Sequence, residues 1–246
     1  MKFASVASYK LKEMTRDIGD LMVPLFFPFL FTVLFGFAFS GVEGPEGGPM
    51  FDSLAPGMVI FALLLLTVGV SGSLSREVEK GTLSRLKLSL MSSFDLLFGV
   101  LLPWTLIAAL QVVILFGMSV VLGFHWTGGL PTLLVSLLIG EIAGIASVAF
   151  GLIIAAFSKS EGRSGQLSVI VVVPLAILFG GFIPLQLGIV SEILPWGQAA
   201  DSLQTLLTKG GQIGDVLPNI GIMALETVVV FAVGVIAFSK ARLRPE

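Results

Sequence analysis

Long apolar runs dominate this chain and alternate with short polar stretches. Six of these runs are long enough to cross a hydrocarbon core of about 30 Å as helices. The pattern predicts an all-α polytopic membrane protein with one domain over residues 1–246. The expected transmembrane helices cover approximately residues 21–41, 55–75, 96–124, 130–157, 167–188 and 218–239.

A further helix is expected before the first run. Apolar residues recur there at three- and four-residue steps, so that a helix would collect them on one face and most charged residues on the other. We expect this amphipathic helix to lie in the cytoplasmic interface, either as a surface anchor or as part of a gating device. Its apolar positions are Phe3, Ala7, Leu11, Met14, Ile18 and Leu21, and its charged ones are Lys10, Lys12, Glu13 and Asp17.

The basic residues give this pattern an orientation. Thirteen of the 14 Lys and Arg residues fall on one side of the six predicted spans, and the loops on the other side hold only Lys209. By the positive-inside rule, both termini and the loops at residues 76–95 and 158–166 are cytoplasmic.

The amino-acid composition excludes several classes of function for this chain. With 55% hydrophobic and only 12% charged residues, the chain cannot be a soluble globular domain. It has no cysteine and a single histidine, His125, which excludes disulfides, thiolate chemistry and a His/Cys metal cluster. Six acidic residues lie in the outward loops, whereas the inward segments hold nearly all the basic ones, and this polarised distribution gives no indication of a nucleic-acid partner. No Gly-x-x-x-x-Gly-Lys-Ser/Thr stretch is present, and the chain itself is therefore not expected to hydrolyse ATP.

Two acids interrupt the apolar runs, Glu141 in the fourth span and Glu226 in the sixth. A carboxylate at such depth costs about 2.5–3.5 kcal/mol, so it normally faces a bundle interior or an aqueous path. The alternative is a neutral acid hydrogen-bonded to a neighbouring helix, for instance to Gln111 of the third span. Both alternatives stay open for Glu141, whereas Glu226 lies nearer the surface and favours the structural one.

Two spans differ in their packing residues. The first is rich in phenylalanine and contains two prolines, which predicts a helix facing lipid or a loosely packed cavity. The fourth carries small residues at helical spacing, which favours close approach of a neighbouring helix. These small residues are Gly140, Gly144, Ser147 and Gly151. Trp126 and Trp196 suit the outer aromatic belt.

The most specific segment is cytoplasmic and begins at Glu79. Gly81 and Thr82 can start a short helix, with Thr82 as its cap, in which Leu83 and Leu86 pack inward. Such a charged helical loop could dock on a partner, or it could be a solvated turn.

This segment resembles the type-2 ATP-binding-cassette (ABC) transporter permeases, whose first long cytoplasmic loop carries Glu-(Lys/Arg)-x-Gly-Thr-Leu-Glu-x-Leu, followed by Thr-Pro. Ser84 replaces the family's second Glu, Leu90 stands at the position of the Pro, and the spacer residue is missing. The matching residues are Glu79, Lys80, Gly81, Thr82, Leu83 and Leu86. A second match, to Gly-(Phe/Leu)-x-x-Pro and a following Leu-Pro, comprises Gly181, Phe182, Pro184, Leu194, Pro195 and Asp201.

The resemblance implies a membrane-spanning permease subunit of an exporter for a hydrophobic or lipid-like substrate. A second permease chain, identical or related, would pair with it in the lipid of a prokaryotic cell (plasma or inner) membrane. No cofactor is expected in this chain, because ATP and Mg²⁺ would bind to a separate ABC ATPase subunit. That ATPase would dock on the loop containing Glu79, Lys80, Gly81, Thr82, Leu83, Arg85 and Leu86. The alternatives are an ion- or proton-coupled transporter that uses Glu141, and a membrane scaffold without transport activity.

Overall fold

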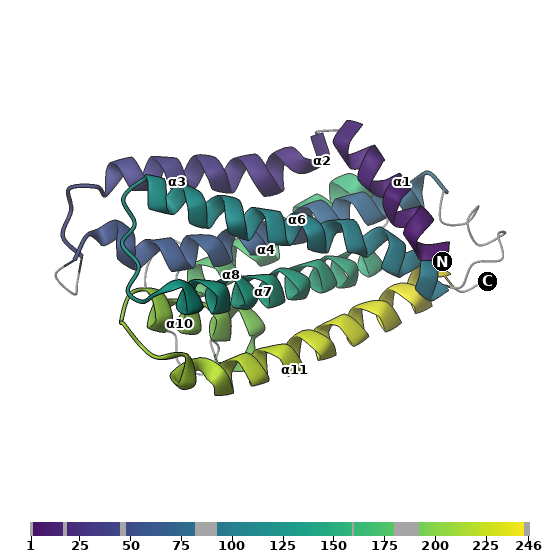
Figure 1. Cartoon of the computed structure of the whole chain (residues 1–246). Helices are drawn as coiled ribbons and strands as arrows, with labels where there is room; N and C mark the ends of the chain where they lie inside the picture. Colours follow the sequence, from purple (N-terminus) through teal and green to yellow (C-terminus); the bar gives the residue numbers. More distant parts are fainter. Residues whose placement is uncertain are drawn as a thin grey trace.

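The computed structural model describes residues 2–16, 19–44, 48–81, 93–158, 160–179 and 192–243, and in these ranges it is a bundle of helices (Figure 1). The N-terminal elements are α1 (Lys2–Arg16), α2 (Gly19–Leu21), the π-helix η1 (Met22–Phe26) and α3 (Phe27–Ala38). The long central helices are α4 (Met50–Glu79), α6 (Ser93–Val121) and α7 (Leu130–Phe157). The C-terminal elements are α8 (Glu161–Leu178), α10 (Pro195–Leu207), α11 (Ile213–Phe238) and the π-helix η2 (Ser239–Leu243).

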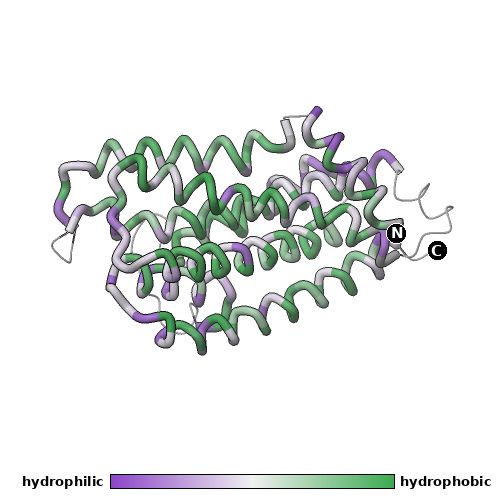
Figure 2. Tube along the Cα trace, viewed as in Figure 1, coloured by the Kyte–Doolittle hydropathy of each residue, from purple (hydrophilic) through white to green (hydrophobic). Residues whose placement is uncertain are grey.

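Five of the described helices are long and apolar enough to cross a membrane, and a shorter apolar helix, Met22–Ala38, precedes them. Figure 2 shows hydrophobic residues along the length of the bundle, with hydrophilic residues gathered toward its two ends and on α1. The prediction of an all-α polytopic membrane protein is therefore confirmed.

The first span is irregular because of its two prolines. Pro28 has no N–H to donate to the carbonyl oxygen of Pro24 four residues earlier, so a helical hydrogen bond is missing there. The side chain of Gln111 on α6 replaces it, with Nε2 2.7 Å from that oxygen. The backbone around Pro24 widens into the π-helix η1. Its aromatic side chains are partly exposed, Phe37 at 71%, as expected for a lipid-facing helix.

Helix α4 lies at the centre of the bundle (Figure 1). Its side chains are buried along almost its whole length. Helix α7 approaches it through small residues. A Cβ at Gly151 would lie 2.7 Å from Cβ of Val70 on α4, and one at Gly144 would lie 2.7 Å from Cβ of Ala108 on α6. Gly140 lies in the same way against Val112, so three helices meet closely along one face of α7.

Helix α10 folds back against α7. Trp196, at its start, donates from Nε1 to Oγ of Ser147 at 2.8 Å, whereas the carbonyl of Leu207, at its end, accepts from the N–H of Thr127 at 2.9 Å. The helix thus runs antiparallel to α7. Trp196 is only 1% exposed and packs on Phe150, so its predicted place in an aromatic belt is wrong. Its hydrogen bond to Ser147 inside the bundle explains the difference.

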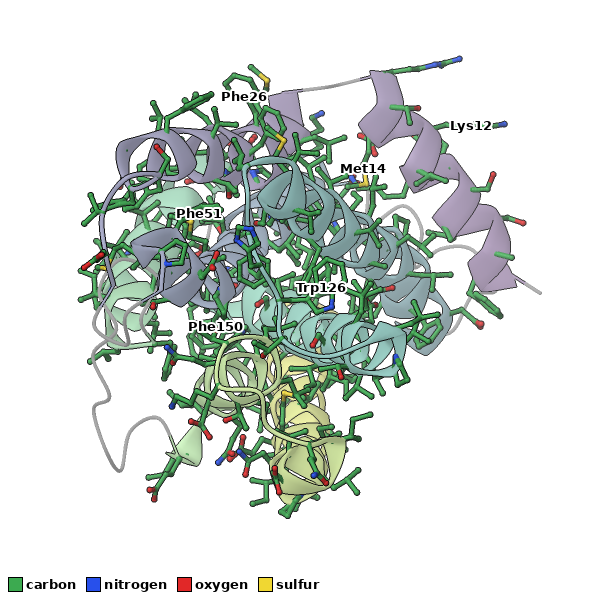
Figure 3. The ribbon with its side chains drawn as sticks, turned by 60° about the vertical axis from the view of Figure 1, so that its left-hand side comes forward. Lys12, Met14, Phe26, Phe51, Trp126 and Phe150 are labelled. Carbon is green, nitrogen blue, oxygen red and sulfur yellow. The ribbon has the colours of Figure 1, made fainter. Side chains whose placement is uncertain are left out.

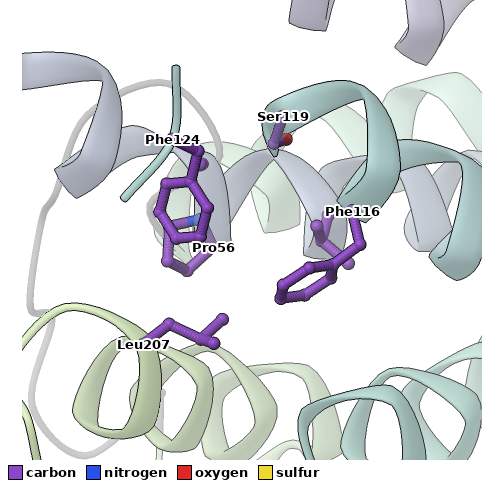
Figure 4. Close-up of a pocket in the computed structure, with 7 residues that line it drawn as sticks. Pro56, Phe116, Ser119, Phe124 and Leu207 are labelled. Atoms are coloured by element: carbon purple, nitrogen blue, oxygen red, sulfur yellow. The ribbon is translucent and has the colours of Figure 1, made fainter. Parts of the chain in front are cut away.

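A small apolar pocket lies at the end of the bundle where α10 stops. The pocket has a volume of about 10 Å³ (Figure 4). It is lined by Ala55, Pro56 and Val59 of α4, Phe116 and Ser119 of α6, Phe124 and Leu207. Its volume is close to the minimum that a single water requires. Beside it, Asp52 accepts from the N–H of His125 at 3.2 Å.

The amphipathic leader forms α1 and lies against α6. Phe3 meets Phe98 edge to face, with ring centroids 5.9 Å apart, and Val6 lies over Gly99. Figure 3 shows Lys12 pointing away from the bundle and Met14 on the side toward it. Two residues depart from the prediction: Lys10 faces inward and is 3% exposed, whereas Leu11 is 41% exposed.

Candidate functional site

The end of α4 that leads into the sequence motif carries charged residues that bind two other helices. The guanidinium of Arg76 donates hydrogen bonds to both carboxylate oxygens of Glu161, the first residue of α8. The bond from Nε to Oε2 measures 2.8 Å, and a second bond joins the guanidinium to Oε1. Bidentate pairs of this kind are the stronger class of ion pair, and they fix orientation as well as distance.

Glu79 adds a second link between the same helices. Its Oε2 accepts from the backbone N–H of Glu161 at 3.2 Å. That N–H belongs to the first turn of α8, whose donors have no partner inside the helix. A carboxylate there also interacts favourably with the helix dipole. The first residue of the family motif thus caps the start of α8.

On another side, Glu77 binds the leader helix. Lys10 of α1 donates from Nζ to Glu77 at 2.8 Å and to Glu13 at 2.9 Å. Burial alone would lower the pKa of Lys10, but the hydrogen bonds and charges of Glu77 and Glu13 outweigh it and raise that pKa above its ordinary value. The lysine is therefore charged at neutral pH, and α1 is fastened to α4 by a buried ion pair.

These contacts define one site, the charged cluster, which consists of Lys10, Glu13, Arg76, Glu77, Glu79 and Glu161. One to two turns away from the cluster, the hydroxyls of Ser71 on α4 and Ser168 on α8 lie 2.6 Å apart and join the same two helices. The cluster therefore ties α1, α4 and α8 together where the motif begins.

The motif itself begins with the end of α4. The N–H of Lys80 donates to the carbonyl of Arg76 at 2.9 Å, and Gly81 follows with φ of +68°, a left-handed conformation that glycine adopts without strain. Gly81 thus ends α4 in this structure. Thr82, Leu83, Arg85 and Leu86 lie outside the described residues, so their helix and its docking role stay predictions.

Comparison with known proteins identifies the family. A model of the family described as ABC-2 type transporter matches residues 1–199. The chain belongs to the ABC-2 type transporter family. It is also 26% identical, over 204 residues, to a linearmycin resistance permease of Bacillus subtilis (strain 168). The match covers 78% of this chain and 50% of the relative, so the chain spans about half the length of that permease.

The intramembrane polar residues of this ABC-2 permease do not form one site. Gln111 donates to the carbonyls of Pro24 and Ala62, at 2.7 and 3.0 Å, and does not bind Glu141. One carboxylate oxygen of Glu141 and one of Glu226 are buried with no hydrogen-bond partner among the described residues. The structure therefore does not show the neutral, hydrogen-bonded pair of Glu141 with Gln111.

Sequence reasoning missed most of the charged cluster. It singled out Glu79 but not Lys10, Glu77 or Glu161, because their partners lie on helices distant in the chain. A signal did exist, since all these residues lie in segments predicted to be cytoplasmic. This location places the residues at the same surface of the membrane but does not show which of them form pairs.

Proposed function

We propose that this chain is the membrane-spanning permease subunit of an ABC exporter, driven by a separate ATPase subunit that docks on the loop beginning at Glu79. The family supports a permease of an ABC transporter. The observation that carries the rest is the charged cluster, because it joins the start of that loop to α1 and α8. The permease would lie in the cell membrane of a prokaryote.

The cluster suggests how force would pass from the ATPase to the membrane. ATP binding and closure of the ATPase subunits would push on the loop and move the end of α4. Because Glu77 holds Lys10 of α1, and Arg76 holds Glu161 of α8, both helices would follow. A single push would thus shift three helices together and change access to the transport path between two permease chains.

A hydrophobic or lipid-like substrate fits the surface of the helices. The first span exposes large apolar side chains such as Phe26, Phe27 and Phe37, and no charged residue stands among them. The relative is named for resistance to linearmycin, which supports export of a harmful compound as the role of this chain too.

Co-purification with the ATPase tests docking. Leu83→Asp would place a charge on the face of the loop assigned to packing and should abolish both assembly and substrate-stimulated ATP hydrolysis. Glu79→Lys should reduce coupling by removing the cap of α8 and setting a cation beside Arg76. Glu43→Lys, an equivalent charge reversal at an exposed outer residue, is the matched control and should leave both unchanged.

Normal assembly and coupling in both Leu83→Asp and Glu79→Lys would exclude this loop as the transmission element. Transport driven by a proton gradient without any ATPase, and lost in Glu141→Gln, would instead favour the coupled transporter.

A further inference from the structure

The outward face of α1 carries a cationic pocket. Tyr9, Lys12 and Arg16 recur at three- and four-residue steps, so the helix places them on one face. Together with Glu13 they line a pocket of about 460 Å³. This volume falls within the range of about 300–1,000 Å³ that is usual for small-molecule sites. Figure 3 shows Lys12 pointing away from the bundle, so this face of α1 is turned outward.

The two cations of the pocket have charge to offer to a ligand. Lys12 and Arg16 are exposed, and neither forms an ion pair with any residue that the structure describes. The acid of the lining, Glu13, instead accepts from Nζ of Lys10 at 2.9 Å. Its charge is partly offset by that contact, so the ammonium and guanidinium groups dominate the pocket.

The spacing of the two cations favours one shared anion. Lys12 and Arg16 are four residues apart, which places their Cβ atoms about 5–6 Å from each other on adjacent turns. Like charges at this spacing destabilise a helix, and an anion bound between them removes the repulsion. A phosphate suits both groups, because a guanidinium can bind it with two parallel hydrogen bonds and an ammonium binds it as a point charge.

The pocket lies where the chain enters the membrane. Arg16 lies shortly before residue 21, the predicted start of the first span. Just beyond it, Met22 and Phe26 are 51% and 53% exposed, and in a bilayer these side chains face hydrocarbon. Figure 1 shows α1 at the end of the bundle, where α2 connects it to the first span. A headgroup bound at α1 can therefore keep its acyl chains in the lipid beside the first span.

The same face points away from the loop that begins at Glu79. Lys10 faces α4 and binds Glu77 there. Lys12 lies about 200° further around the helix, at 100° per residue, and so faces nearly the opposite way. Tyr9 is 65% exposed, and its apolar ring and polar hydroxyl suit the boundary between headgroups and hydrocarbon. These features favour a lipid over an ATPase subunit as the occupant of the pocket.

We propose that this cationic pocket binds the headgroup of an anionic phospholipid, phosphatidylglycerol, from the cytoplasmic leaflet. The phosphate lies between Lys12 and Arg16, and the hydroxyl of Tyr9 donates to the headgroup. A zwitterionic lipid brings an ammonium group beside the same two cations, so it binds less tightly. The proposal goes beyond the proposed function, since it concerns a lipid that holds α1 at the membrane surface rather than an exported substrate.

Native mass spectrometry of the purified full chain in a neutral detergent tests the pocket. The probes are dioctanoyl phosphatidylglycerol and dioctanoyl phosphatidylethanolamine, which share their acyl chains. The first phosphatidylglycerol should bind several-fold more tightly than the first phosphatidylethanolamine. The double variant Lys12→Gln/Arg16→Gln should weaken phosphatidylglycerol binding by about tenfold or more, the loss expected for charge-assisted hydrogen bonds. It should change phosphatidylethanolamine binding much less.

A matched double variant distinguishes a site from diffuse attraction. Arg163→Gln/Lys240→Gln removes the same charge from exposed positions on α8 and η2 and should keep wild-type binding of phosphatidylglycerol. The melting temperatures of both double variants without lipid should stay close to that of the wild type, because all four side chains are exposed. Equal affinity for the two lipids, or equal loss of binding in both double variants, would overturn the proposal.

Two further results would assign the pocket to another occupant. Inorganic phosphate that displaces phosphatidylglycerol as effectively as a second anionic lipid would show a site for the free anion. Unchanged lipid binding in Lys12→Gln/Arg16→Gln, with loss of co-purification with the ATPase, would show a protein contact. Either result overturns the lipid site and leaves the proposed export function intact. A chain that binds the lipid as described but drives no export with any ATPase supports the lipid site and overturns the proposed function.

Discussion

Lys10 is the residue whose burial most distinguishes the structure from an ordinary surface helix. Lys10→Met should destabilise the protein, because Glu77 would keep its charge in a buried position. Breaking a buried pair in this way costs about 3–5 kcal/mol. Thermal unfolding of the purified chain measures the loss, with Lys12→Met on the exposed face of α1 as the control. Adding Glu77→Gln to Lys10→Met should recover part of the stability, and a further loss in the double variant would argue against the pair.

The sign of its pH dependence follows from the raised pKa of Lys10. A lysine with a folded-state pKa above its ordinary value contributes stability that is fully present below that ordinary value, about 10.4. The contribution is lost as the pH rises through the folded-state pKa. The difference in melting temperature between wild type and Lys10→Met should therefore be constant near neutral pH and shrink only at strongly alkaline pH.

For single residues, the sequence pattern predicted helix α1 but not which of its side chains face the bundle. Lys10 and Leu11 both lie within about 60° of the line through Ala7 and Met14, at 100° per residue. Periodicity cannot choose between them. Glu77, 67 residues away in the chain, decides the outcome, because its carboxylate offers Lys10 a buried partner.

Among the elements, α7 depends on glycine at its contacts. Gly144→Ala should destabilise the chain by about 1–3 kcal/mol, because the new methyl would lie 2.7 Å from Cβ of Ala108 and would force α6 and α7 apart. Gly221→Ala on α11 has no atom within 4 Å of the new methyl and should be neutral or stabilising by up to about 1 kcal/mol. Equal melting temperatures for the two variants would contradict the close packing.

The link between α4 and α8 is a second test at the level of elements. Arg76→Gln and Glu161→Gln should each lower the coupling of ATP hydrolysis to transport, and the double variant should be little worse than either single one. Such non-additivity is expected of residues that act through one contact. The measurement is the number of ATP molecules hydrolysed per substrate exported, and additive losses would mean that the two side chains act separately.

The elements show why patterns predict some helices better than others. The fourth run, expected over 130–157, forms α7 over Leu130–Phe157, because Gly128 and Gly129 precede it and the backbone becomes extended at Ser158. The first span, expected over 21–41, is divided between α2, η1 and α3. Its prolines are visible in the sequence, but the compensating Gln111 is not, since it lies 87 residues away.

For the whole molecule, hydropathy and charge together predicted an all-α membrane protein, because the bilayer admits few other folds for such runs. The described structure adds how the ends are arranged. The end of α4 contacts the start of α8 and the leader α1, and Arg242 near the C-terminus donates to the carbonyl of Ser158 at the end of α7. Residues from both ends of the chain thus gather at one end of the bundle (Figure 1).

The side of the membrane that this end of the bundle faces can be tested directly. The chain has no cysteine, so single cysteines can be placed without background. Ser160→Cys lies beside the charged cluster, and Ser40→Cys lies on an exposed residue at the other end of the first span. If the basic end is cytoplasmic, an impermeant maleimide added to intact cells should label Ser40→Cys and spare Ser160→Cys, which should react only after the membrane is opened. Labelling of Ser160→Cys from outside would reverse the orientation. It would also place the charged cluster and its loop where no ATPase subunit could reach them.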